Sequence, residues 1–108
     1  MIELDEKDKR IMDLIETTVC KYFSVEEKDV VSRNHKRDAS LARGFIWYIL
    51  HYNYNFSIKK LANGYYRNIR SITSLISKTK HAIKKQVSYK QMYNFIIEQT
   101  QEQQRAHQ

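Results

Sequence analysis

SIKKLANGYYRNIRSITSLISKTK, residues 57–80, has the pattern of two helices joined by a short turn. The Ser57 hydroxyl can cap the first helix, and Gly64 suits the left-handed residue that closes it. Asn68 can cap the second helix. On one face of the second helix, apolar or small side chains recur at helical spacing: Ile69, Ile72, Ile76, Thr79 and Ile83. We therefore predict a helix-turn-helix over residues 57–80.

The other face of the second helix is polar, and this helix contains no carboxylate. Its members are short or basic: Arg70, Ser71, Ser74, Ser77 and Lys78. Such a face suits a helix that lies against a polyanion, as the second helix of a DNA-binding helix-turn-helix does. It also suits two solvated helices of a small bundle, so the rest of the chain has to decide between these interpretations.

The composition predicts an all-α fold. The 108 residues include no proline and only two glycines, which leaves little material for tight turns and hairpins. With 42% hydrophobic residues, a chain of this length can bury one core, so we expect a single domain over residues 1–108. The patterning indicates about six helices, and the apolar run at residues 45–50 marks the central one.

Capping patterns give the expected helix boundaries. An N-terminal helix lies within residues 1–23, and Asp38 or Ser40 can cap the third helix. Two capping-box patterns mark the starts of a short second helix and of the last helix: Ser24 with Glu27, and Ser88 with Gln91. Residues 100–108 have no apolar content to hold them, so we expect a frayed tail there.

The positive charge is concentrated in the middle of the chain. Residues 1–30 hold nine acidic and five basic side chains, a net of −4. Residues 31–90 hold thirteen Lys or Arg against the single carboxylate of Asp38, a net of +12, and residues 91–108 come to −1. Generic solvated surfaces mix both signs, so a long segment with one acidic group indicates a phosphate-bearing partner.

No arrangement in the sequence is typical of an enzyme or a metal site. The four histidines, His35, His51, His81 and His107, lack metal-ligand spacing, and there is no Gly-rich phosphate loop. Cys20 is the one cysteine, so we expect it in the core and the protein in a reducing cytoplasm. No apolar run approaches 18 residues, and the charged N-terminus is unlike a secretory signal. We predict no enzyme activity, cofactor, metal or membrane association.

Residues 19 to about 79 resemble the C-terminal DNA-binding domain, domain IV, of the bacterial replication initiator DnaA. Three stretches carry the likeness: VCKYFSVEEKDVVS (19–32), RNHKRDASLARGFIWYIL (33–50) and SIKKLANGYYRNIRSITSLISK (57–78). They look like that family's first helix with a short helix after it, its basic loop with an apolar helix, and its Trp-repressor-like helix-turn-helix. The resemblance implies six helices that bind duplex DNA, here as a module without the family's ATPase.

By position, the resemblance implies that Arg43 enters the minor groove. It also implies that the basic loop holding Arg33, Lys36 and Arg37 tracks the DNA backbone, and that residues 67–71 read bases and phosphates in the major groove. This sequence departs from the family pattern at four positions: Gly44 for Gln, Asn68 for Asp, Ile69 for His and Arg70 for a hydroxyl residue. The family's target site is therefore not carried over.

We predict a monomeric, cytoplasmic, nucleoid-associated protein that binds double-stranded DNA. The residues predicted to read bases are Asn68, Arg70, Ser71, Ser74 and Arg43. The residues predicted to hold phosphates are Arg33, Lys36, Arg37, Lys59, Lys60, Arg67 and Lys78. Two alternatives stay open: a module that docks on an acidic replication or transcription protein, and RNA or single-strand binding through Tyr65, Tyr66 and the basic loop.

Overall fold

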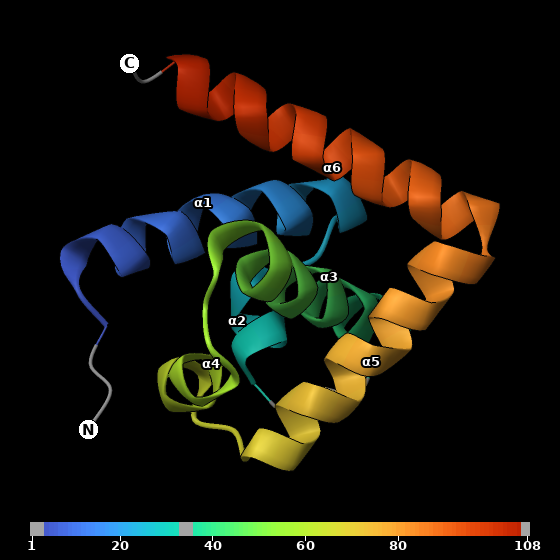
Figure 1. The fold of residues 1–108 in the computed structure, drawn as a ribbon. Coiled ribbons are helices and arrows are strands. Elements are labelled where there is room, and N and C mark those ends of the chain that lie inside the picture. The colour runs from blue at the N-terminus through green and yellow to red at the C-terminus, as the bar shows by residue number, and fades with distance from the viewer. Residues whose placement is uncertain (1–3, 33–35, 107–108) are drawn as a thin grey trace.

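The structure is a computed structural model that describes residues 4–32 and 36–106. Over these residues it contains six α-helices and no strand (Figure 1), which confirms the all-α prediction. The helices are α1 (Glu6–Phe23), α2 (Glu27–Val31), α3 (Arg37–Tyr54), α4 (Ile58–Tyr65), α5 (Ile69–Lys85) and α6 (Val87–Ala106). None of the helices in this part of the chain has the length and apolar content that a membrane span requires.

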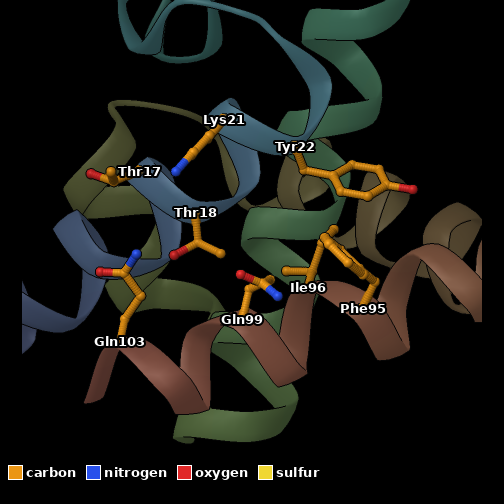
Figure 2. Close-up of a pocket in the computed structure, with 8 residues that line it drawn as sticks. All are labelled: Thr17, Thr18, Lys21, Tyr22, Phe95, Ile96, Gln99 and Gln103. Atoms are coloured by element: carbon orange, nitrogen blue, oxygen red, sulfur yellow. The ribbon is translucent and has the colours of Figure 1, made fainter. Parts of the chain in front are cut away.

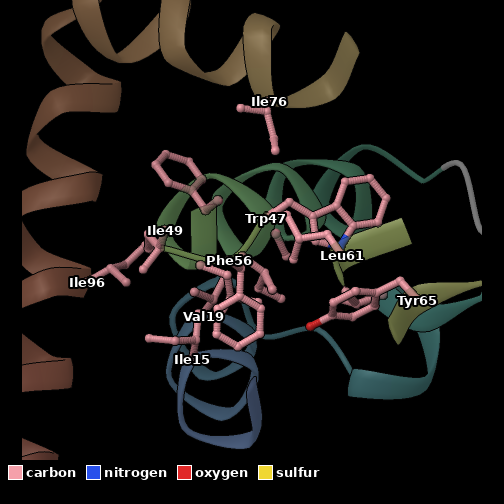
Figure 3. Packing of buried hydrophobic residues seen from close by; sticks show 14 of the residues in the cluster. Ile15, Val19, Trp47, Ile49, Phe56, Leu61, Tyr65, Ile76 and Ile96 are labelled. Atoms are coloured by element: carbon pink, nitrogen blue, oxygen red, sulfur yellow. The ribbon is translucent and has the colours of Figure 1, made fainter. Parts of the chain in front are cut away.

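Helix α3 is the centre of the fold, as its apolar run predicts. It packs against α1, α2, α4 and α5, and its residues from Ala42 to Trp47 are all buried. Figure 3 shows Trp47 and Ile49 of α3 surrounded by core side chains from the other helices. Helices that approach from several sides leave α3 without a solvated face along this run, which is why its sequence shows little amphipathic alternation.

Helix α6 closes the fold on the side of α1. It packs against both α1 and α5 and runs antiparallel to α1 (Figure 1). Ile96 and Thr100 are buried in this contact, and the helix continues to Ala106. The predicted frayed tail is therefore wrong for residues 100–106, which are helical and begin at the buried Thr100; residues 107–108 lie outside the described residues.

Two predicted helix caps are confirmed at the starts of α4 and α5. The Ser57 hydroxyl accepts a hydrogen bond from the backbone N–H of Lys60 at 3.0 Å, and Asn68 Oδ1 accepts one from the N–H of Ser71 at 2.7 Å. Three residues, 66–68, separate α4 from α5. The two helices pack on each other and bury Leu61 and Ile72.

The residue that closes α4 is different from the predicted one. Tyr66 adopts the left-handed conformation, with φ of 55°, whereas Gly64 lies inside the helix with a negative φ. A Cβ atom at Gly64 would lie 3.0 Å from Leu4 Cδ1, so this glycine serves the close packing of the N-terminal segment rather than the turn.

Three other capping predictions are wrong. Ser24 is the left-handed residue after α1, with φ of 55°, and α2 begins after Glu26 without a side-chain cap. Helix α3 begins at Arg37 after Lys36, so the residues expected to cap it lie within its first turns. Ser88 likewise lies inside α6, because α5 and α6 meet at the single residue Gln86.

Candidate nucleic-acid interface

The outward face of α5 is the main candidate surface. Its buried side chains, Ile72, Ile76, Thr79 and Ile83, point toward the core at spacings of three and four residues. The face opposite to them is exposed along the whole helix and carries Arg70, Ser74, Ser77 and His81. Figure 1 shows α5 at the edge of the molecule, where its outer side is open.

Lysines lie on both sides of that exposed strip. They are Lys78 and Lys85 on one side and Lys80 and Lys84 on the other, and all four are exposed. The sequence has no carboxylate between Asp38 and Glu98, so α4, α5 and the first half of α6 offer these cations no acidic partner of their own. These helices therefore contribute only positive charge to the surface, which favours a phosphate-bearing partner.

The first turn of α5 is fixed by its cap. Asn68 Oδ1 accepts a hydrogen bond from the Ser71 N–H, so only the amide NH₂ group of Asn68 could carry out its predicted base-reading role. Arg70 and the Ser71 and Ser74 side chains are exposed, as a base-reading role requires.

Arg43 has a different position from the one predicted. Its side chain is 5% exposed, and its guanidinium donates from Nε to the carbonyl of Val30 at 2.8 Å. Its Nη2 donates to the carbonyls of Asp29 at 3.1 Å and Ser32 at 3.0 Å. These oxygens belong to the C-terminal end of α2, which lacks helical partners for them. Arg43 therefore ties α2 to α3 from inside the protein, and the expected minor-groove contact is corrected.

Arg67 lies beside Arg43, at the turn between α4 and α5. It also donates to the carbonyl of Ser32, and its guanidinium lies 5.9 Å from the ring centre of Trp47. Burial, and next the charge of Arg67, lower the pKa of Arg43, although its guanidinium stays protonated near neutrality. Trp47 Nε1 is buried and has no hydrogen-bond partner within the described chain. Arg67 thus connects the turn to α2 and α3, in addition to its predicted place near phosphates.

Lys60, another predicted phosphate contact, already has a partner. Its Nζ lies 3.1 Å from Asp8 Oδ2 and 5.1 Å from the ring centre of Phe56. Burial acts to raise the pKa of Asp8, but the hydrogen bond from Lys60, the Asp5 backbone N–H and the Lys60 charge outweigh it, so this pKa is lowered. Lys60 therefore joins α4 to the start of α1, while its neighbour Lys59 is exposed.

The start of α3 brings a predicted phosphate contact close to α5. Arg37 and Lys78 line one pocket of about 370 Å³, together with Ser40, Thr79 and Tyr89 among others. Lys36 is exposed next to Arg37, and Arg33 lies outside the described residues. The structure therefore brings Arg37 and Lys78, 41 positions apart in the sequence, to the same surface.

A second pocket lies between α1 and α6, away from this surface. It has a volume of about 370 Å³, and Figure 2 shows its lining: Thr17, Thr18, Lys21, Tyr22, Phe95, Ile96, Gln99 and Gln103. Tyr22 and Phe95 face each other with ring centres 5.4 Å apart, and both are partly exposed. Lys21 is the charged group of this lining, so the pocket lacks the paired reactive side chains that catalysis needs.

Chemistry elsewhere in the described chain is sparse. No group of three or more His, Cys, Asp or Glu side chains gathers within residues 4–32 and 36–106 in a way that could hold a metal ion. Cys20 is buried as predicted; burial, and then the charges of Glu27 and Glu16, raise the pKa of its thiol to about 11, which keeps the reactive thiolate scarce.

The second half of α5 carries exposed residues that were not among the predicted DNA contacts. They share the outward side of α5 with Lys78 and are Lys80, His81, Lys84 and Lys85. The helical period of the sequence predicts their positions once α5 is known to continue to Lys85.

The chain matches no protein-family model and no curated protein sequence.

Proposed function

We propose that this protein binds double-stranded DNA through a helix-turn-helix formed by α4 and α5, with α5 in the major groove. The observation that carries the proposal is the exposed face of α5, where Arg70 and Ser74 lie opposite the buried stripe and no carboxylate is near in the sequence. The sequence resemblance to DnaA domain IV supports a role in replication or transcription control.

In this proposal Arg70 is the principal base-reading residue. An arginine pairs bidentately with guanine O6 and N7, which is worth about 1–3 kcal/mol of discrimination. Ser71, Ser74 and the amide NH₂ of Asn68 are close enough in the helix to contact neighbouring bases or phosphates. Arg43 is not among the proposed base-reading residues because it is buried, and Lys60 is not among the proposed phosphate contacts because it pairs with Asp8.

Phosphate contacts come from cations around the rim of the helix-turn-helix. Lys59, Lys78, Lys36 and Arg37 are exposed there, and Arg67 lies at the turn. Arg33 is retained from the sequence prediction. If about six phosphates are neutralised, the slope of log affinity against log salt concentration is expected near roughly −5.

The test is selection of bound duplexes from a random pool, followed by affinity measurements with Arg70→Ala. We expect Arg70→Ala to relax the sequence preference, whereas Lys36→Ala weakens all sequences alike. Lys9→Ala, an exposed lysine on α1, is the matched control and leaves affinity unchanged. Absence of duplex binding by the wild-type protein at low salt would disprove the function, and an equal loss on all sequences would remove Arg70 from the base-reading set.

One observation favours a second candidate, a protein-interaction module for an acidic partner. Tyr66 is 90% exposed and Ile69 is 48% exposed, directly beside the cations of the turn. Exposed tyrosine and arginine together are enriched at protein interfaces. Binding to poly-glutamate in the absence of any duplex shift at low salt would favour this candidate.

A further inference from the structure

The outward face of α5 divides into three parallel strips. The central strip holds Arg70, Ser74, Ser77 and His81, at successive spacings of four, three and four residues. One flank carries Lys78 and Lys85, and the other carries Lys80 and Lys84. Two small hydroxyl residues therefore occupy the middle of the helix, and cations lie on either side of it.

The length of this pattern limits how α5 can meet DNA. With a rise of 1.5 Å per residue, the central strip from Arg70 to His81 is about 16 Å long. A helix that entered a groove only with its first turn would leave the lysines of residues 78–85 pointing away from the duplex. A helix lying along the groove would use the whole pattern, since a major groove about 12 Å wide admits a helix and has one phosphate strand on each side.

The flanking lysines have no competing ion pair in the described chain. The salt bridges there join Lys28 to Glu26 and Lys60 to Asp8. The Nζ atom of Lys80 instead lies 5.3 Å from the ring centre of Tyr52, so the Lys80 side chain contacts α3. Stabilisation of the helix dipole accounts for cations in the last turn of α5, but Lys78 and Lys80 lie before that turn.

We propose that α5 lies lengthwise in the major groove of duplex DNA. Ser77 and His81 then face base edges beyond those that Arg70 and Ser74 contact. The two lysine flanks hold the phosphates of opposite strands, Lys78 and Lys85 on one and Lys80 and Lys84 on the other. This inference rests on the proposed function and extends it to a longer site with two further base-facing residues.

The first experiment measures the salt dependence of duplex binding for two double variants, Lys80→Ala with Lys84→Ala and Lys78→Ala with Lys85→Ala. Each is expected to reduce the magnitude of the log–log slope by about 2, because each lost phosphate contact removes about 0.9. Lys7→Ala with Lys9→Ala, two exposed lysines of α1, is the control and leaves the slope unchanged. Circular dichroism checks that each variant keeps its helix content.

The second experiment repeats the duplex selection with His81→Ala. We expect loss of preference at a position several base pairs from the one that Arg70→Ala relaxes, with a change of about fivefold in affinity for the selected site. Duplex RNA of the same sequence is expected to compete poorly, because its deep, narrow major groove does not admit a helix.

The outcomes separate this inference from the function on which it rests. If Arg70→Ala relaxes the preference while the lysine pairs and His81→Ala change neither slope nor preference, the lengthwise placement is wrong and the function stands. Equal competition by duplex RNA also overturns the placement. If the wild-type protein fails to bind duplex DNA at low salt, the function itself is wrong.

Discussion

Arg43 and Arg67 donate hydrogen bonds to the same atom, the carbonyl oxygen of Ser32. Arg43 reaches it from the central helix α3, and Arg67 from the turn before α5. Two cations that share one acceptor repel each other, and the carbonyl oxygens at the end of α2 offset this repulsion. The position of the turn between α4 and α5 relative to the core therefore depends on the end of the five-residue helix α2.

Arg43→Ala is expected to destabilise the protein by about 3 kcal/mol, because it leaves the carbonyls of Val30 and Asp29 without their charged donor, while the carbonyl of Ser32 keeps Arg67. Arg43→Lys should recover only part of this loss, since an ammonium group cannot reproduce the planar fork of a guanidinium. Urea unfolding followed by circular dichroism measures both values. Arg70→Ala, at an exposed position on α5, serves as the control and should change stability by less than about 0.5 kcal/mol.

The same variants test the location of Arg43 against the sequence prediction. A stably folded Arg43→Ala protein with unchanged unfolding free energy and reduced duplex affinity would show that Arg43 contacts DNA after all. The buried position of Arg43 predicts the opposite result. Arg43→Ala should lower the free energy of unfolding, and it should weaken duplex binding only because the turn before α5 is displaced.

Much of the fold followed from local sequence signals. The period of residues 69–83 predicted the buried side of α5 correctly from Ile72 to Ile83, whereas Ile69, expected on the same side, is 48% exposed. The caps Ser57 and Asn68 were predictable because a cap accepts a hydrogen bond from a residue three positions away. Contacts between distant segments were not predicted. Arg43 donates hydrogen bonds to backbone carbonyl oxygens, which every residue has. The sequence of α2 therefore does not reveal that its carbonyls are the partners of Arg43.

The errors at helix ends have a similar cause. Gly64 was assigned to the turn because glycine adopts positive φ without strain, but Tyr66 adopts that conformation while Gly64 accommodates Leu4. The polar end of α6 has little apolar content to predict a helix, yet Thr100 is buried at its start and the helix continues to Ala106. In the candidate interface, exposure of Arg70 and Ser74 followed from the pattern, whereas the pairing of Lys60 with Asp8 required the structure.

The Asp8–Lys60 pair predicts a pH-dependent loss of stability. The pKa of Asp8 is lowered in the folded state from its ordinary 3.8, so its contribution is present above that pH and disappears as the pH falls through the folded value. Asp8→Asn is expected to cost about 1 kcal/mol at pH 7 and nothing at strongly acidic pH. Thermal unfolding of both proteins from pH 2 to 7 measures the difference. A constant difference across this range would show that the charge of Asp8 has no part in it.

Glu16 is expected to show the opposite dependence. Burial raises its pKa above 4.5, the hydrogen bond from the Tyr65 hydroxyl lowers it, and the charges of Glu27 and Asp13 raise it further, for a net increase. The folded protein therefore holds this proton more tightly than the unfolded chain, and Glu16 costs stability as the pH rises through the folded pKa. Glu16→Gln keeps an acceptor for Tyr65, so its stability relative to wild type should increase between pH 4 and 7. A relative stability that falls over this interval in urea titrations would contradict the assignment.

Gly44 tests how closely α3 and α5 pack beneath the proposed interface. A Cβ atom at this position would overlap Thr79 Oγ1, a side chain that is itself buried. Alanine gains about 1 kcal/mol of helix propensity over glycine, but overpacking of a core costs about 1–3 kcal/mol. We expect Gly44→Ala to be destabilising by about 1–2 kcal/mol in urea unfolding, because a buried side chain between two helices cannot move aside freely.

A double-mutant cycle identifies the clash as the cause. Thr79→Ala removes the overlapping oxygen and should restore most of the stability of the Gly44→Ala protein, whereas Thr79→Val keeps the bulk and should not. Gly64→Ala is the matched control, since its nearest neighbours are the side-chain ends of Leu4 at 3.0 Å and Met12 at 3.4 Å, which can shift. There the propensity gain should prevail, and stability should be equal to or above that of the wild type. If the free energy of unfolding of Gly44→Ala is also equal to or above that of the wild type, α3 and α5 can separate at little cost. Tight packing of α5 on the core would then not be what fixes the position of its outer face.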